Sequence, residues 1–197
     1  MRLKTLLVVV ALAFCLCAAA PTFAQNLVTN GSFETGDFSG WTTGGNFEFT
    51  QVTSGPFDSY TGAQDGTFYV TAGPVGSDGT LSQTLSTVAG AQYQISFWLA
   101  AVGDDPSDFS VSWNGTQLLS LTDPNTGANW MNYTFNVTGT GSDTLKFSFM
   151  DSPAYIAFDN VSVTEVSGTS VPEPSSFLLL GTGALGLGGF IRRKLSR

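Results

Sequence analysis

Histidine is absent from the chain, and its only two cysteines, Cys15 and Cys17, lie near the N-terminus. Imidazole and thiolate catalysis and the usual histidine and cysteine zinc sites are therefore excluded from the rest of the chain. Disulfide bonds are excluded there as well, although an oxidising exterior would allow them. Stability must come from a hydrophobic core, with or without a metal ion.

Positive charge is also scarce. Only Lys146, of the chain's 7 Lys and Arg residues, lies between residues 25 and 171, whereas only Glu173 of its 15 Asp and Glu residues lies outside that segment. Fourteen carboxylates against one lysine give a net charge near −13. Such a segment repels nucleic acid and anionic lipid, so nucleic acid is excluded as a partner. A cation or a neutral polymer is a more suitable ligand, and solubility is the other explanation of the acidity.

Residues 1–24 have the order of a secretory signal peptide. Arg2 and Lys4 form a charged start, residues 6–14 are apolar, and residues 22–24 form a small-x-small cleavage site. This predicts export through the secretion translocon and removal of the leader by signal peptidase. A lipoprotein signal is the alternative, but a bulky residue precedes each cysteine where a small one is needed.

The C-terminal end combines a Pro-Glu-Pro triplet, an apolar run and a basic cluster. The prolines predict an extended linker over residues 167–176. The run with its two preceding serines is about 17 residues, roughly 25 Å as a helix, slightly short of a bilayer core of about 30 Å. A transmembrane helix is predicted over 177–191, with the basic tail 192–197 on the cytoplasmic side. The residues of this pattern are Pro172, Glu173, Pro174, Arg192, Arg193 and Lys194.

An ordinary C-terminal anchor is one interpretation of this end. Its order of triplet, short apolar helix and Arg-Arg-Lys also resembles the PEP-CTERM sorting signal of Gram-negative bacteria. The resemblance implies recognition by an exosortase-type membrane protease, transient anchoring in the inner membrane and removal of the helix. It further implies delivery to the cell surface or extracellular matrix, which is an address and not an activity.

Between the two ends, apolar and polar residues alternate in strand after strand, with turn residues between them. Asn114-Gly115 is a strong signal for a two-residue type I′ hairpin turn. No stretch reads as an amphipathic helix. Residues 25–166 are therefore predicted to form one all-β domain, an antiparallel β-sandwich of jelly-roll type. The alternating segments are 67–71, 92–101, 108–113, 130–138, 144–150 and 155–158.

Alternation assigns side chains to the two faces of each strand. In the last strand, Ile156 and Phe158 fit one register and Val161 and Val163 the other, which predicts a β-bulge at Asp159-Asn160. The residues predicted to face the core are Tyr93, Ile95, Phe97, Leu99, Phe109, Val111, Trp113, Met131, Tyr133, Phe135, Val137, Leu145, Phe147 and Phe149.

Three aromatic residues fall on the opposite face: Tyr69, Trp98 and Trp130. Short amides and hydroxyls share that face with them. Rings flanked by such groups suit a sugar, whose C–H faces pack on rings while its hydroxyls form hydrogen bonds. The three residues are predicted to form a ligand platform. The alternative is that a loop covers them or that they fill a sheet edge.

The segment 30–36, Asn-Gly-Ser-Phe-Glu-Thr-Gly, with Gly40-Trp41 and the closing strand 157–163, resembles galactose-binding-like jelly rolls, including many carbohydrate-binding modules. The resemblance implies a structural Ca²⁺ between Glu34 and Asp159, with carbonyls from the loop 64–66, since calcium takes oxygen ligands. The alternative is that both are capping or turn carboxylates.

Paired carboxylates that a glycosidase would need occur at Asp104, Asp105 and Asp108, but the first two lie in a loop rich in turn residues. The sequence therefore predicts a non-catalytic, exported protein that binds polysaccharide, with an exopolysaccharide as the partner. A structural or adhesive matrix protein without a defined sugar site is the alternative.

Overall fold

The computed structural model describes residues 25–166, which form ten β-strands and contain no helix. The all-β prediction is confirmed. The strands are β1 (Thr42–Gly45), β2 (Thr50–Ser54), β3 (Phe68–Ala72), β4 (Gly79–Ser86), β5 (Gln92–Ala100), β6 (Ser107–Trp113), β7 (Thr116–Thr122), β8 (Met131–Thr138), β9 (Ser142–Asp151) and β10 (Ile156–Glu165).

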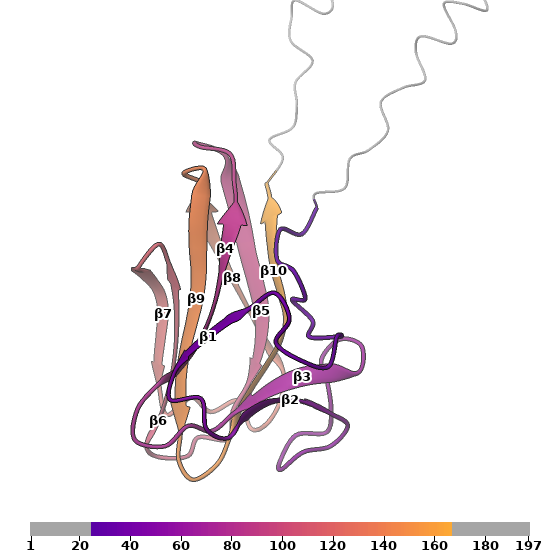
Figure 1. Ribbon diagram of the computed structural model, residues 1–197. Helices are drawn as coiled ribbons and strands as arrows, with labels where there is room; N and C mark the ends of the chain where they lie inside the picture. The colour runs from indigo at the N-terminus through magenta and orange to yellow at the C-terminus, as the bar shows by residue number, and fades with distance from the viewer. Residues whose placement is uncertain (1–24, 167–197) are drawn as a thin grey trace, which may run out of the picture. The chain divides into compact units, whose positions relative to one another are not determined.

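The strands pair into two antiparallel five-stranded sheets that pack face to face (Figure 1). Sheet 1 has the order β1-β4-β9-β6-β7, and sheet 2 has the order β2-β3-β10-β5-β8. The predicted β-sandwich is therefore confirmed. Chain neighbours such as β3 and β4 or β5 and β6 lie in different sheets, so the chain crosses repeatedly from one layer to the other.

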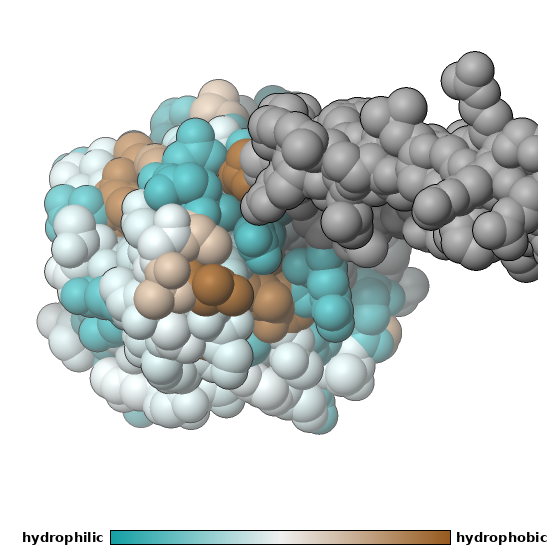
Figure 2. Space-filling model, turned by 90° about the horizontal axis from the view of Figure 1, so that it is seen from above, coloured by the Kyte–Doolittle hydropathy of each residue, from teal (hydrophilic) through white to brown (hydrophobic). Residues whose placement is uncertain are grey.

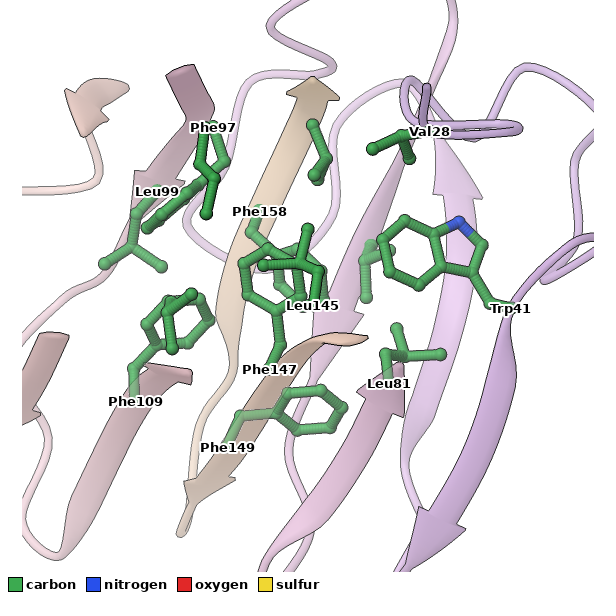
Figure 3. Packing of buried hydrophobic residues seen from close by; sticks show 14 of the residues in the cluster. Val28, Trp41, Leu81, Phe97, Leu99, Phe109, Leu145, Phe147, Phe149 and Phe158 are labelled. Carbon is green, nitrogen blue, oxygen red and sulfur yellow. The ribbon is translucent and has the colours of Figure 1, made fainter. Parts of the chain in front are cut away.

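The core lies between the two sheets and follows the alternation of the strands (Figure 3). Phe97 of β5 packs edge-on against Phe147 of β9, with ring centroids 5.3 Å apart. Phe147 in turn stacks on Phe158 of β10 at 5.4 Å. Burying each such side chain contributes on the order of 1.5–3 kcal/mol before the loss of conformational entropy. The sandwich is therefore held by aromatic contacts that cross between its layers.

One predicted core residue is wrong: Met131 is 48% exposed. It is the first residue of β8, which is the edge strand of sheet 2 and has only β5 as a neighbour. No further strand covers its side chain. Tyr133 and Phe135 of the same strand are only partly buried but do pack against the core, as predicted.

Both predicted backbone irregularities are present. Asn114 and Gly115 have φ values of 50° and 78°, and Trp113 pairs directly with Thr116, as a type I′ turn requires. In β10 the register with β5 shifts between Asp159 and Ser162, and Asn160 has a φ of 50°. This shift is the predicted β-bulge.

The N-terminal motif packs against β10. Phe33 is fully buried, stacks on Trp41 at 5.7 Å and meets Phe158 edge-on at 5.9 Å. Gly31 lies so close to β10 that an added Cβ would be 2.0 Å from the carbonyl oxygen of Val161, which only glycine allows. This packing fixes the position of the segment that carries Glu34.

Residues 1–24 and 167–197 lie outside the described part of the chain. The predicted signal peptide, linker, helix 177–191 and basic tail therefore lie outside it, as do Pro172, Glu173, Pro174, Arg192, Arg193 and Lys194. Within residues 25–166, no helix is long and apolar enough to cross a membrane.

Candidate functional site

The outer face of sheet 2 carries the three predicted platform residues and is divided into a covered and an open part. In the covered part, Tyr60, Tyr69, Ala100 and Ala157 form a second, small cluster of buried residues. Phe57, Ala63, Ala128, Trp130 and Tyr155 pack against that cluster. Segments 55–63 and 128–130 thus lie over this part of the sheet and shield it from solvent.

Tyr69 is completely buried within this cluster. Its hydroxyl donates a hydrogen bond to the carbonyl of Gly55 at 2.9 Å, and its ring meets Trp130 edge-on at 5.8 Å. The expectation of an open platform of three rings is therefore corrected. Tyr69 does lie on the outer face, but the covering segment prevents it from contacting a ligand, and it supports Trp130 instead.

Trp130 is half-buried at the border of the covered part. Its indole N–H donates to the carbonyl of Gly62 at 3.2 Å, which joins the end of the loop before β8 to segment 55–63. The ring is therefore fixed in orientation by Tyr69 and Gly62 together, while part of its surface stays accessible.

Trp98 of β5 is half-buried and belongs to neither buried cluster. Its neighbours across the sheet are Asn132 of β8 and Asp159 of β10. The side-chain amide of Asn132 donates to the hydroxyl of Ser96 at 3.0 Å and to the carbonyl of Phe97 at 3.2 Å. Trp98 therefore offers ring surface beside an amide that the sheet holds in place.

Beyond Trp98 the outer face is open and neutral. Gln92 donates from its amide to the hydroxyl of Thr138 at 2.9 Å. From Gln92 to Trp98 the strand covers about 20 Å. We call these uncharged side chains the polar strip: Gln92, Gln94, Ser96, Asn132, Thr134, Asn136, Thr138, Ser162 and Thr164.

Asp159 lies next to Trp98 but is fully buried. Its Oδ2 accepts hydrogen bonds from the backbone N–H groups of Gln64 and Asp65, both at 2.9 Å. Burial raises the pKa of Asp159 to about 7, although these hydrogen bonds and one from the N–H of Asn160 act to lower it. The carboxyl group is therefore held against the segment 64–65 with no positive group acting on it.

Glu34 holds the same loop from its other end. Its Oε1 accepts hydrogen bonds from the N–H groups of Thr67 at 2.8 Å and Phe68 at 2.9 Å. Gly66 lies in the middle of this loop, between the residues that Asp159 contacts and those that Glu34 contacts. It has a φ of 64°, and an added Cβ there would be 2.4 Å from Cδ of Glu34. Glu34 and Asp159, the pair that the family resemblance implied, thus both contact the loop 64–68.

The donor set has the chemistry that calcium prefers, because both groups are carboxylates. Two carboxylates do not complete a shell of six to eight oxygens, and no group of three or more Asp or Glu residues suited to a metal occurs in residues 25–166. Loop carbonyls and water would have to supply the rest. Calcium at this pair stays a prediction.

Sheet 1 presents a different outer face. A cavity of about 360 Å³ lies over β6, β7 and β9 and contains Lys146, the only cation of the described residues. Serine and threonine residues and Gln117 account for most of its lining, and no aromatic side chain lines it. This cavity therefore offers no ring surface to a ligand. Figure 2 shows that the described surface is mainly hydrophilic or intermediate when viewed from above, with apolar residues in small patches.

Sequence reasoning did not identify segment 55–63 as a cover or Tyr60 as its anchor. Tyr60 donates from its hydroxyl to the carbonyl of Tyr155, 95 positions along the chain. No local pattern predicts such a contact, and the only related signal is an aromatic residue among turn residues.

Comparisons with known proteins agree with this architecture. TmCBM61, solved in complex with β-1,4-galactotriose, is 21% identical with a TM-score of 0.58, over 72% of this chain and 99% of that one. The xylan-binding CBM22-1 domain of Xyn10C from Paenibacillus barcinonensis is 19% identical with a TM-score of 0.51, over 76% of this chain and 99% of that one.

The enzymatically active domain of tailspike protein 4 from bacteriophage CBA120 is 21% identical with a TM-score of 0.52. This similarity covers 72% of this chain but only 21% of that one. At these identities the similarities show the fold alone. A search of curated proteins finds no match.

Two families match by sequence. Residues 170–194 match the PEP-CTERM protein-sorting motif, which implies export and exosortase processing. Residues 25–153 match the family model of a carbohydrate binding domain, and this match extends over more than half of the chain. The chain therefore belongs to that carbohydrate-binding domain family and ends in a PEP-CTERM sorting signal.

Proposed function

We propose that this chain is an exported, non-catalytic protein that binds a neutral polysaccharide on the outer face of sheet 2. The observation that carries the proposal is the half-exposed ring of Trp98 beside the uncharged polar strip. A sugar chain lying along β5 would place C–H faces on Trp98 and hydroxyls against the amides of Asn132 and Gln94. Trp130 provides a second ring at one end of this path.

The charge of the domain supports a neutral ligand. With fourteen carboxylates and a single lysine in residues 25–166, the domain repels a polyanion, and that lysine lies on the other sheet. Hydrogen bonds to amides and hydroxyls do not depend on charge. Binding is therefore expected to change little with ionic strength.

A binding role is favoured over catalysis because the carboxyl group beside Trp98 is not available as an acid or base. Asp159, next to Trp98, is buried and has its oxygens bonded to backbone N–H groups. A glycosidase needs two carboxyl groups that flank the scissile bond. Asp104 and Asp105, the other paired carboxylates, lie in the loop that joins β5 to β6.

The sorting signal supplies the destination in this proposal. An exosortase-type protease cleaves near Pro172, Glu173 and Pro174 after export by the secretion translocon and removal of residues 1–24 by signal peptidase. The domain then reaches the cell surface or extracellular matrix of a Gram-negative bacterium, where an exopolysaccharide is the partner.

Retention in gels that contain single neutral polysaccharides tests the proposal. The unmodified protein is expected to be retarded by at least one polysaccharide, and Trp98→Ala to migrate as in an empty gel. A core tryptophan would cost roughly 3–5 kcal/mol on truncation, whereas Trp98→Ala should keep a nearly unchanged Tm. Gln117→Ala, on the outer face of sheet 1, is the matched control and should be retained normally.

If no polysaccharide retains the unmodified protein, the proposal fails and a structural or adhesive matrix role takes its place. Unfolding of Trp98→Ala would show that the ring belongs to the core and would also contradict the proposal.

A further inference from the structure

Strand β9 places an aspartate at each end of its core-facing row. Asp143 and Asp151 have the same parity as Leu145, Phe147 and Phe149, and they are 0% and 2% exposed. Two carboxyl groups of one strand are thus buried at the two ends of one core. Their surroundings are opposite in character.

Asp143 is fully partnered. It accepts hydrogen bonds from the N–H of Thr140 at 2.8 Å and the hydroxyl of Thr140 at 2.7 Å, and also from the hydroxyl of Thr87 and the amide of Asn114. Burial acts to raise its pKa, but these hydrogen bonds outweigh burial and lower the pKa to about 2. The fold therefore holds this carboxylate as a stable anion.

Asp151 lacks such partners. Its Oδ1 is buried and has no hydrogen-bond partner, while the N–H of Ala154 is the backbone donor to the carboxyl group. Burial and, to a lesser extent, the negative charges of Asp104, Asp58 and Asp123 together raise the pKa of Asp151 to about 7, although that hydrogen bond acts to lower it. No lysine or arginine is among the groups that act on it.

The structure brings these acidic neighbours together through Ser107, which pairs with Asp151 across β6 and β9. The N–H of Ser107 donates to Oδ1 of Asp123 at 3.0 Å, and its hydroxyl donates to the carbonyl of Asp104 at 2.6 Å. Asp58 lies in the covering segment 55–63, and its charge acts on Tyr60 as do those of Asp104 and Asp151. Asp151, the backbone of Asp104 and the carboxylate of Asp123 therefore meet around Ser107, and the charge of Asp58 acts at the same end of the sandwich.

An unpartnered buried carboxylate among like charges is costly, and a cation is the partner that would remove both costs. Oxygen-only surroundings select a hard divalent ion. We propose that this end of the sandwich binds Ca²⁺, with Oδ1 of Asp151 and the carboxylate of Asp104 as ligands.

No three carboxylates within residues 25–166 are grouped tightly enough to hold a metal by themselves, so backbone carbonyls and water complete the shell. This site is separate from Glu34 and Asp159.

Calcium counting by equilibrium dialysis on the full chain tests the proposal. Asp151→Asn keeps the shape of the side chain and removes its charge, and it is expected to lower the bound Ca²⁺ by one ion per chain. Asp105→Asn is the matched control, because Asp105 is exposed in the same loop and does not act on Asp151. It should bind as much Ca²⁺ as the unmodified chain.

Thermal unfolding at pH 8 gives a second readout. Asp151→Asn is expected to have a Tm equal to or above that of the unmodified chain in chelator, since it removes a buried charge, but a smaller rise in Tm when Ca²⁺ is added. In an Asp159→Asn background, a Ca²⁺-dependent rise should remain and should disappear when Asp151→Asn is added. Asp104→Asn serves if Asp151→Asn does not fold, and it should weaken Ca²⁺ binding.

Unchanged Ca²⁺ binding in Asp151→Asn, or in Asp104→Asn if that variant replaces it, would overturn the proposal. Loss of all Ca²⁺ binding on Asp159→Asn alone would overturn it as well. Neither result bears on polysaccharide retention, which the gel experiment measures independently.

Discussion

At the scale of single residues, Asp143 stabilises the fold as an anion, and its removal should lower the free energy of unfolding. Asp143→Ala leaves the N–H of Thr140 and the amide of Asn114 without their acceptor. Hydrogen bonds to charged groups contribute about 1.5–3 kcal/mol each, so the free energy of unfolding should fall by at least about 3 kcal/mol. Urea unfolding measures this loss. Asp105→Ala, which removes an exposed carboxylate, is the control.

The lowered pKa of Asp143 also sets a pH window. A carboxyl group with a pKa of about 2 in the folded protein stabilises it fully above its ordinary pKa of 3.8, and that stabilisation is lost as the pH falls through about 2. The difference in stability between the unmodified protein and Asp143→Ala should therefore shrink between pH 4 and pH 2. A difference that stays constant over this range would contradict the assignment.

The pKa of Asp159 is shifted in the opposite direction from that of Asp143. Its pKa is raised from 3.8 to about 7, so the stabilisation linked to its protonated form is complete below about pH 4 and is lost as the pH rises through about 7. In chelator the Tm should fall from pH 5 to pH 8. The fall should be less steep in Asp159→Asn, where only Asp151 still contributes.

Calcium added at pH 8 should raise the Tm. At a calcium concentration of a hundred times Kd, the free energy of unfolding should increase by about 2.7 kcal/mol. Equal calcium responses in Asp159→Asn and the unmodified protein would contradict a site at Glu34 and Asp159.

At the scale of elements, the loop 64–68 depends on glycine. Gly66→Ala combines a φ of 64° with a Cβ 2.4 Å from Cδ of Glu34, whereas Gly115→Ala has a φ of 78° and no atom within 4 Å. Left-handed backbone costs about 1–2 kcal/mol for a residue with a Cβ, and both variants bear this cost. Gly66→Ala should therefore be less stable than Gly115→Ala and should alone displace Glu34. Equal Tm values would show that Glu34 adapts without cost.

The elements that the sequence predicts well are those whose signal is local. Alternation places Phe97 in the core and Trp98 on the outer face, and Asn114-Gly115 forms its turn as predicted. Met131 fails because alternation cannot tell an edge strand from a central one. The short strands β1 and β2 have too little alternation to be identified.

The candidate site was predictable only in part, because alternation assigns a side chain to a face but does not show what covers that face. Parity assigns Tyr69 and Trp130 to the outer face but says nothing about what lies above them. Tyr69 is covered through a hydrogen bond to Gly55, a contact that depends on the path of a loop. Glu34 and Asp159 are distant in the sequence, and the prediction that they act together came from a family resemblance and not from their spacing.

For the whole molecule, the C-terminal sorting motif implies export and exosortase processing. Residues 170–194 match the sorting motif, so the protein released at the cell surface should lack the predicted helix 177–191. Intact-mass measurement of the released protein should give a chain that starts near Gln25 and ends close to the Pro-Glu-Pro triplet. Recovery of a released form that still ends at Arg197 would contradict exosortase processing.

The two outer faces of the sandwich offer different chemistry to a partner. Sheet 2 has ring surface and neutral amides, whereas the cavity of sheet 1 has hydroxyls and Lys146 without a ring. Of these two combinations, only the first can both pack against the C–H face of a sugar and form hydrogen bonds with its hydroxyls. The location of bound sugar therefore separates the proposed function from any use of the second face.

Heteronuclear NMR of the labelled protein with an oligosaccharide from a retained polysaccharide measures that location directly. Binding on the outer face of sheet 2 predicts that the resonances of the indole N–H of Trp98 and the side-chain amides of Asn132 and Gln94 shift as the oligosaccharide is added, while those of Gln117 and Thr144 do not. Shifts confined to Gln117, Thr144 and their neighbours on sheet 1, with Trp98 unchanged, would contradict it.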